Sequence, residues 1–169
     1  MNHLSVETIM AEERFILTPT GYEQLQRDLE DLLEQGKEVA EQMADVHDDT
    51  EFGEEATYHD VMEAKERLDQ RIAHLRGVLQ RAEVISDEDP DPTRVDPGEQ
   101  VTVWDFSAKE EVEFQLLSTE EVANGLSGIS TESPVGRALL GRRVGDVIEV
   151  EVPDGKAKYA IRKIERRIV

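Results

Sequence analysis

Apolar residues recur every three or four positions in two long runs in the first half of the chain, and this pattern constrains the fold most. The first run comprises Tyr22, Leu25, Leu29, Leu32, Gly36, Val39, Met43 and Val46. The second run comprises Tyr58, Val61, Lys65, Leu68, Ile72, Leu75, Leu79 and Ala82. An alternation of three and four is the period of a coiled-coil seam, so each run predicts a long helix with a narrow apolar stripe.

The connection between the two runs is short and lies around residues 47–53. Two matched stripes are buried most simply when one helix folds back on the other. Thr18 and Pro19 are the residue types that favour a helix N-cap and a first helical position. We therefore predict a flexible N-terminal segment over residues 1–16 and an antiparallel coiled-coil helical hairpin over residues 17–86.

The second half of the chain has a different pattern. Residues 87–98 combine acidic residues with three prolines, a composition that favours a linker. Beyond it, apolar residues alternate with polar ones, as at Val101 and Val103, which is typical of short strands. Ser133 and Pro134 open one short helix. The predicted fold class is α+β, with the hairpin followed by a small β-rich domain over residues 99–169.

The charge balance limits what the chain can bind. It has 39 acidic and 19 basic residues, giving a formal net charge of -20. This charge repels phosphates, so direct binding of duplex DNA is not expected. The absence of cysteine excludes disulfides and thiolate zinc sites. No apolar stretch approaches the roughly 20 residues needed to span a bilayer, so we predict a cytoplasmic protein whose partner is a protein or a metal ion.

Acidic residues are concentrated at the predicted tip of the hairpin. Between Glu38 and Ala64 there are ten acidic residues and no lysine or arginine, and six of the ten are Asp45, Asp48, Asp49, Glu51, Glu54 and Glu55. Crowded carboxylates repel one another, and Mg²⁺ prefers oxygen ligands while leaving part of its coordination shell to others. The tip could therefore complete a metal site begun by another macromolecule. Acidic runs are also common as solvated faces, and the pattern alone leaves both interpretations open.

Three segments resemble those of the bacterial Gre transcript-cleavage factors, in the same order along the chain. Residues 50–59 (TEFGEEATYH) resemble the family's tip signature. Residues 17–22 (LTPTGY) and 129–141 (ISTESPVGRALLG) resemble two further family segments. The resemblance extends over residues 17–164. It implies a coiled coil that enters the secondary channel of bacterial RNA polymerase, followed by an FKBP-like domain that binds near the channel rim.

The resemblance also implies roles for particular residues. Glu51 and Glu54 take the tip positions that hold an active-site Mg²⁺ shared with the polymerase, which then cleaves the 3′ end of backtracked nascent RNA. The factor contacts that RNA only indirectly. We therefore expect the chain to be no enzyme itself, to bind no cofactor tightly in isolation and to act as a monomer. In the family, the turn occupied here by Glu132, Ser133 and Pro134 contacts polymerase.

The tip departs from the family signature in ways that leave the outcome open. Glu51 replaces an aspartate and Glu55 an asparagine, while Asp48 and Asp49 add surplus charge. A second branch of the family enters the channel and inhibits synthesis, by trapping the metal or blocking the site, and extra tip acids are compatible with that branch. A third hypothesis, from another class, is a coiled-coil chaperone or scaffold whose acids only keep it in solution.

Overall fold

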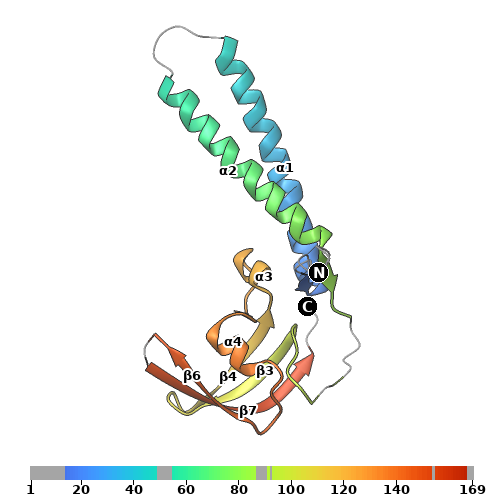
Figure 1. Ribbon diagram of the computed structural model, residues 1–169, viewed down its shortest axis with the longest axis vertical. Helices are drawn as coiled ribbons and strands as arrows, with labels where there is room; N and C mark the ends of the chain where they lie inside the picture. The colour runs from blue at the N-terminus through green and yellow to red at the C-terminus, as the bar shows by residue number, and fades with distance from the viewer. Residues whose placement is uncertain (1–13, 49–54, 87–90, 92, 154, 167–169) are drawn as a thin grey trace, which may run out of the picture. The chain divides into compact units, whose positions relative to one another are not determined.

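The computed structural model describes residues 14–48, 55–86, 91, 93–153 and 155–166, with side chains described except at residues 45–48 and 55–58. The described chain forms two compact units (Figure 1). The first unit contains Glu23–Arg81. The second unit combines Arg14–Tyr22 with the described residues from Ala82 onward. Each unit is described separately below.

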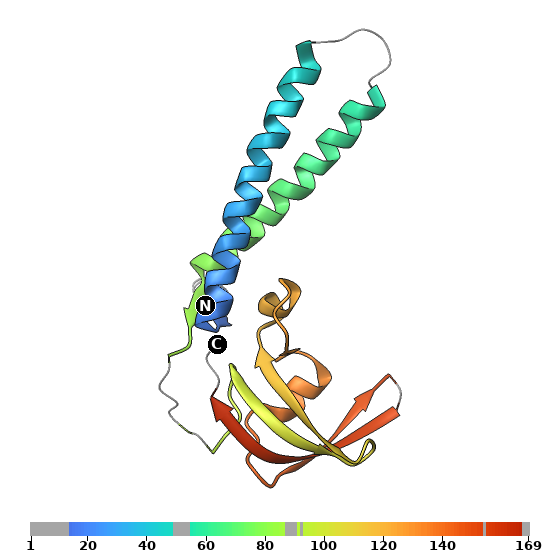
Figure 2. The same cartoon turned by 180° about the vertical axis from the view of Figure 1, so that it is seen from behind.

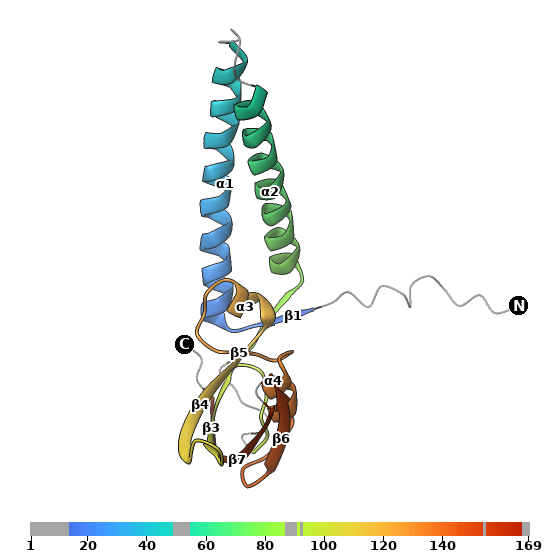
Figure 3. The same ribbon diagram turned by 90° about the vertical axis from the view of Figure 1, so that its left-hand side faces the viewer.

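Two long helices form the hairpin, α1 (Pro19–Asp48) and α2 (Glu55–Gln80). They run side by side in opposite directions (Figures 1 and 3). Leu25, Ile72 and Leu75 are buried, and every other predicted seam position with a described side chain in the first unit is half-buried. The predicted antiparallel pair is therefore confirmed. Among the described residues, no helix is both long enough and apolar enough to cross a membrane.

The base of the hairpin differs from the prediction. Helix α2 ends at Gln80, and Ala82, predicted as the last seam residue, begins strand β2 (Ala82–Val84). This strand pairs in parallel with β1 (Phe15–Leu17). Phe15 and Ile16, which the sequence placed in the flexible segment, are therefore part of a ribbon. Neither three-residue strand is recognisable in the sequence, because its partner lies more than sixty residues away.

The second unit is built on a five-stranded sheet with the order β5-β4-β3-β7-β6 (Figure 2). Its strands are β3 (Glu99–Asp105), β4 (Glu110–Leu117), β5 (Ile129–Ser130), β6 (Val147–Val152) and β7 (Gly155–Arg166). Its helices are α3 (Thr119–Ala123) and α4 (Pro134–Leu139). The α+β class and the helix opened by Ser133 are confirmed, whereas α3 was not predicted.

The core of this unit lies on one face of the sheet. Alternating residues of the strands, such as Val101 and Val103, are fully buried there with Leu139 from α4. Val95 joins the same core, although it was predicted to lie in the linker. Its N–H donates to the carbonyl of Arg142 at 2.8 Å, and its carbonyl accepts from Gly141 at 2.8 Å. The proline-rich composition concealed an apolar residue that is folded into the domain.

The hairpin offers a test of its packing at Gly36, the one glycine in the first seam. A Cβ added there would lie 3.7 Å from Ile72 Cδ1 and 3.9 Å from Leu68 Cδ2, which are ordinary contacts. Glycine inside a helix costs about 1 kcal/mol relative to alanine. Gly36→Ala should therefore stabilise the hairpin by about that amount. Thermal unfolding followed by far-ultraviolet circular dichroism measures it, and a lower midpoint would contradict the helix pairing described here.

Candidate functional site

The predicted acidic tip coincides with the end of the hairpin where the two helices are connected. Asp48 is the last residue of α1 and Glu55 is the first residue of α2. These two helix ends lie at the same end of the hairpin (Figure 1). Asp49, Glu51 and Glu54 lie outside the described residues. The structure therefore locates the predicted tip in the hairpin but gives no side-chain geometry for its carboxylates.

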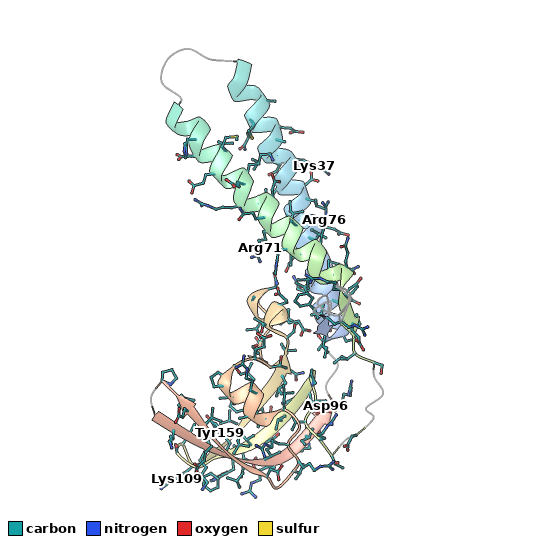
Figure 4. All side chains as sticks on the ribbon, viewed as in Figure 1. Lys37, Arg71, Arg76, Asp96, Lys109 and Tyr159 are labelled. Carbon is teal, nitrogen blue, oxygen red and sulfur yellow. The ribbon has the colours of Figure 1, made fainter. Side chains whose placement is uncertain are left out.

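Ion pairs bracket the acidic stretch. On α1, Lys37 Nζ donates to Glu34 Oε2 at 2.8 Å, and this contact raises the pKa of Lys37 (Figure 4). On α2, Arg67 donates to the carboxylate of Glu63, and this hydrogen bond lowers the pKa of Glu63. Basic residues thus offset acidic ones at the two ends of the stretch. Between Glu38 and Ala64 the sequence contains no lysine or arginine that could do the same.

The described carboxylates inside that stretch, other than Glu63 at its boundary, carry uncompensated charge. Glu38, Glu41 and Asp60 are exposed, and none of the three forms an ion pair with the described residues. Within the described ranges, no three His, Asp or Glu side chains are grouped so that they could hold a metal ion. The metal ligands predicted from the sequence, Glu51 and Glu54, lie outside those ranges. Exposed carboxylates that form no ion pair with the described residues thus lie on both helices next to the tip.

The turn before α4, which contains the predicted polymerase-binding residues, is fully described. Ser133 is the N-cap of α4, and its Oγ accepts from the N–H of Gly136 at 3.0 Å. The same hydroxyl donates to the carbonyl of Ser130 at 2.7 Å. Pro134 occupies the first helical position, where its missing N–H costs nothing. The hydrogen bond that the Ser133 hydroxyl donates and the one that it accepts both stabilise the turn.

Glu132 is fixed in the same turn by a small polar network. Its N–H donates to Ser130 Oγ at 3.0 Å, and its Oε2 accepts from Thr119 Oγ1 at 3.1 Å. Glu132 and Pro134 are exposed, whereas Ser133 is half-buried. The turn therefore presents one carboxylate and one proline ring in fixed positions, which suits a protein contact. Thr119 was missed in the sequence because its role depends on a contact across the fold.

A buried carboxylate, Glu121 of α3, joins two segments of the second unit that are distant in the sequence. It is 1% exposed, and its oxygens accept four hydrogen bonds. Two come from the N–H and Oγ of Ser118, at 2.8 and 2.9 Å, and complete a capping box. The other two come from the N–H and Oγ1 of Thr18, at 2.8 and 2.5 Å. Glu121 thus holds the residue that precedes helix α1.

The first turn of α1 is shaped to admit this carboxylate. Thr18 Oγ1 also accepts from the N–H of Gly21 at 3.0 Å, which confirms the predicted cap. A Cβ at Gly21 would lie 2.0 Å from Glu121 Oε1, so only glycine fits beside the carboxylate. The sequence analysis did not single out Glu121. The spacing of Ser118 and Glu121 is a capping-box signal, but nothing local indicates the contact with Thr18.

Together, the fold and these sites define a two-part protein in which an acidic helical hairpin is joined to a small β-rich domain. Two family descriptions cover most of the chain. "Transcription elongation factor, N-terminal" matches residues 15–84, and "Transcription elongation factor, GreA/GreB, C-term" matches residues 89–166. Each description corresponds mainly to one of the two parts.

Two individual sequences agree with the family match, and one solved structure is also similar to the chain. The transcription elongation factor GreA of Clostridioides difficile is 37% identical over 155 residues, covering 91% of this chain and 98% of the relative. GreA of Thermoanaerobacter pseudethanolicus is 38% identical over 152 residues, covering 89% and 97%. The solved GreA factor homolog 1 of Thermus thermophilus is 27% identical, covering 90% and 99%, with a TM-score of 0.43. The chain belongs to the GreA/GreB family of transcription elongation factors.

Proposed function

We propose that the chain binds bacterial RNA polymerase and brings its acidic tip through the secondary channel to the active centre, where it stimulates cleavage of backtracked RNA. The observation that carries this proposal is the run of ten acidic residues without a lysine or arginine, placed around the connected end of a helical hairpin. Membership of a family of transcription elongation factors supports it. The protein would act in the bacterial cytoplasm as a monomer.

The tip residues fit a hard divalent cation by their chemistry. The acidic side chains there are carboxylates, which Mg²⁺ prefers, and no lysine or arginine between Glu38 and Ala64 competes for them. Glu51 and Glu54 would hold the Mg²⁺ shared with the polymerase, while Asp48, Asp49 and Glu55 would add negative charge. The bound metal would stabilise the attacking and leaving oxygens of the cleavage reaction. The chain would supply carboxylates and their placement, and would neither be an enzyme nor hold the metal tightly alone.

The rigid turn before α4 is proposed as a second contact with polymerase. Glu132 and Pro134 are exposed there, and Ser133 fixes their backbone. A contact in the β-rich domain would raise affinity and hold the protein on the polymerase while the tip acts. Linking two contacts in one chain raises the overall affinity without any new interaction at the tip.

The substituted tip supports a second candidate function. Glu51 is one methylene longer than the family's aspartate, and a misplacement of about 1 Å can cost on the order of 10²-fold in catalysis. With Asp48, Asp49 and Glu55 in surplus, the tip could trap the metal or block nucleotide entry without promoting cleavage. Such a factor would inhibit RNA synthesis. The scaffold hypothesis differs from both because it predicts no specific binding to polymerase.

One experiment separates these functions. The cognate polymerase is stalled in a backtracked complex with labelled RNA, and the purified protein is added with Mg²⁺. Cleavage stimulation predicts release of short 3′ fragments, and an inhibitor predicts no fragments but slower nucleotide addition. Absence of both effects at saturating protein, together with no co-purification with polymerase, would leave only the scaffold hypothesis.

The turn gives a separate prediction about affinity. Replacing Glu132 with lysine and Pro134 with alanine should weaken polymerase binding about tenfold, because a rim charge is reversed and a rigid contact is lost. Fluorescence anisotropy with labelled protein measures the affinity. Glu151→Lys, which reverses an exposed charge on β6, is the matched control and should change binding little. Equal losses in both variants would show that net charge, and not this turn, determines the affinity.

A further inference from the structure

One edge of the five-stranded sheet is mostly uncovered among the described residues. Strand β5 pairs with β4 only at Leu116 and Leu117. Residues Glu110–Phe114 of β4 pair with β3 on one side and have no described strand on the other. An unpaired strand edge presents N–H and C=O groups that can bind another extended chain.

Hydrogen bonds on either side of β4 show which residues face this edge. The carbonyl of Leu116 accepts from Gly98 at 2.7 Å, on the β3 side. The carbonyl of Leu117 accepts from Thr131 at 2.8 Å, on the β5 side. Because backbone groups alternate between the two sides of a strand, Glu111 and Glu113 direct their N–H and C=O groups toward the open edge.

A cavity of about 610 Å³ lies at the same edge. Its lining includes Glu113 and Phe114, which belong to opposite faces of β4, so the cavity reaches around the strand edge. Leu126 and Ile129 line the side beyond the edge, and Leu117 adds a further apolar wall. The edge is therefore bordered by apolar surface that can receive side chains of an added strand.

The charge along the edge indicates the chemistry of an occupant. Glu110, Glu111 and Glu113 are exposed, and none of the three forms an ion pair with the described residues. Lysine or arginine at alternate positions of an extended segment would lie opposite these carboxylates. A second copy of the chain is disfavoured, because pairing two β4 edges would bring the same acidic residues together.

We propose that the open edge of β4 binds an extended, basic segment of a partner protein, which adds a strand beside Glu110–Phe114 and inserts apolar side chains into the adjoining cavity. Backbone hydrogen bonds to Glu111 and Glu113 provide the pairing. The acidic side chains select a basic sequence, and the cavity selects apolar residues at intervening positions. This interaction goes beyond the proposed action at the polymerase active centre, and its test uses no polymerase.

The test uses the full chain and an array of eight-residue peptides in which lysine alternates with Val, Ile, Leu, Phe, Tyr or Thr. A second array replaces every lysine with glutamate. Selected basic peptides are then added to isotope-labelled protein, and amide hydrogen exchange is measured by NMR. The expected result is that basic peptides bind at least tenfold more tightly than their acidic counterparts. Exchange at Glu111 and Glu113 should slow at least tenfold on binding, because their N–H groups become bonded.

Two variants test the pairing and the charge separately. Glu111→Pro removes an N–H that faces the open edge without removing a bond to β3, and it should abolish peptide binding. The double variant Glu111→Lys with Glu113→Lys should reverse the preference toward the acidic array. Far-ultraviolet circular dichroism and thermal unfolding verify that each variant is folded, because Trp104 lies opposite Glu111 and its fluorescence would respond to the substitutions directly. Failure of the arrays to bind, equal binding of both arrays, or protection confined to other residues would overturn the proposal.

Discussion

Replacing Glu51 and Glu54 together with glutamine is expected to lower the rate of 3′-fragment release by about 100-fold or more. Glutamine has nearly the same size but carries no charge, so it weakens a metal contact without changing the length of the side chain. If the tip acts only on the active centre, affinity for polymerase should remain within about twofold, since the contact proposed for the β-rich domain is unchanged. The measurement is single-turnover cleavage of backtracked RNA at saturating protein.

The matched control neutralises two acids away from the tip. Glu38 and Glu41 are exposed on α1 and form no ion pair with the described residues, so Glu38→Gln with Glu41→Gln removes the same charge. This control should keep most of the cleavage activity. Similar losses in both double variants would mean that the overall negative charge matters more than the tip carboxylates. If the protein inhibits RNA synthesis instead, the two double variants should be compared by their effect on the rate of nucleotide addition.

Glu121→Ala is expected to destabilise the β-rich unit by roughly 3 kcal/mol, through loss of a cap and exposure of unsatisfied buried donors. Four hydrogen bonds from Thr18 and Ser118 end on this carboxylate, and both N–H groups would lose their acceptor. For a domain of this size, the loss corresponds to a fall of about 15 °C in the unfolding midpoint. Trp104 lies in β3, so its fluorescence follows this unit specifically.

Two comparison variants separate the hydrogen bonds from a general loss of charge. Glu121→Gln keeps one acceptor oxygen but places an amide among donors, so its midpoint should lie between those of the wild type and the alanine variant. Glu110→Ala removes an exposed acid of the same unit that forms no ion pair with the described residues, and it should change the midpoint little. A midpoint for Glu121→Ala within a few degrees of the wild type would contradict the anchoring role of this residue.

The parts of the fold that the sequence predicts are those governed by local periodicity. The spacing of Leu25, Ile72 and their neighbours identified both helices, because a narrow stripe must face a partner. Alternation at Val101 and Val103 identified strands, because the apolar face of a strand must also pack against a partner. By contrast, the pairing of Phe15 with Ala82 depends on two short segments meeting across the fold. Composition also led to a wrong placement of Val95. The prolines around it indicate a linker, and composition does not reveal that this one side chain is buried in the core.

The same distinction between local signals and long-range contacts applies to the sites. The tip acids and the cap at Ser133 are visible in the sequence, because charge density and helix-start signals are local. The contact of Glu121 with Thr18 joins residues 103 positions apart, and no periodic or compositional signal marks it. The open edge of β4 was equally hidden, because it depends on how few residues β5 contributes to the sheet. Long-range pairings of this kind require the folded structure.

The most direct measurement asks whether the tip reaches the RNA in the polymerase active centre. The chain has no cysteine, so Phe52→Cys creates a unique position for a photoreactive cross-linker at the tip. Ser107→Cys, exposed in the turn between β3 and β4, carries the same reagent as a control. In backtracked complexes with labelled RNA, the account predicts cross-linking to the 3′ segment from position 52 and none from position 107. No cross-link from position 52, or equal cross-linking from both positions, would contradict delivery of the tip to the active centre.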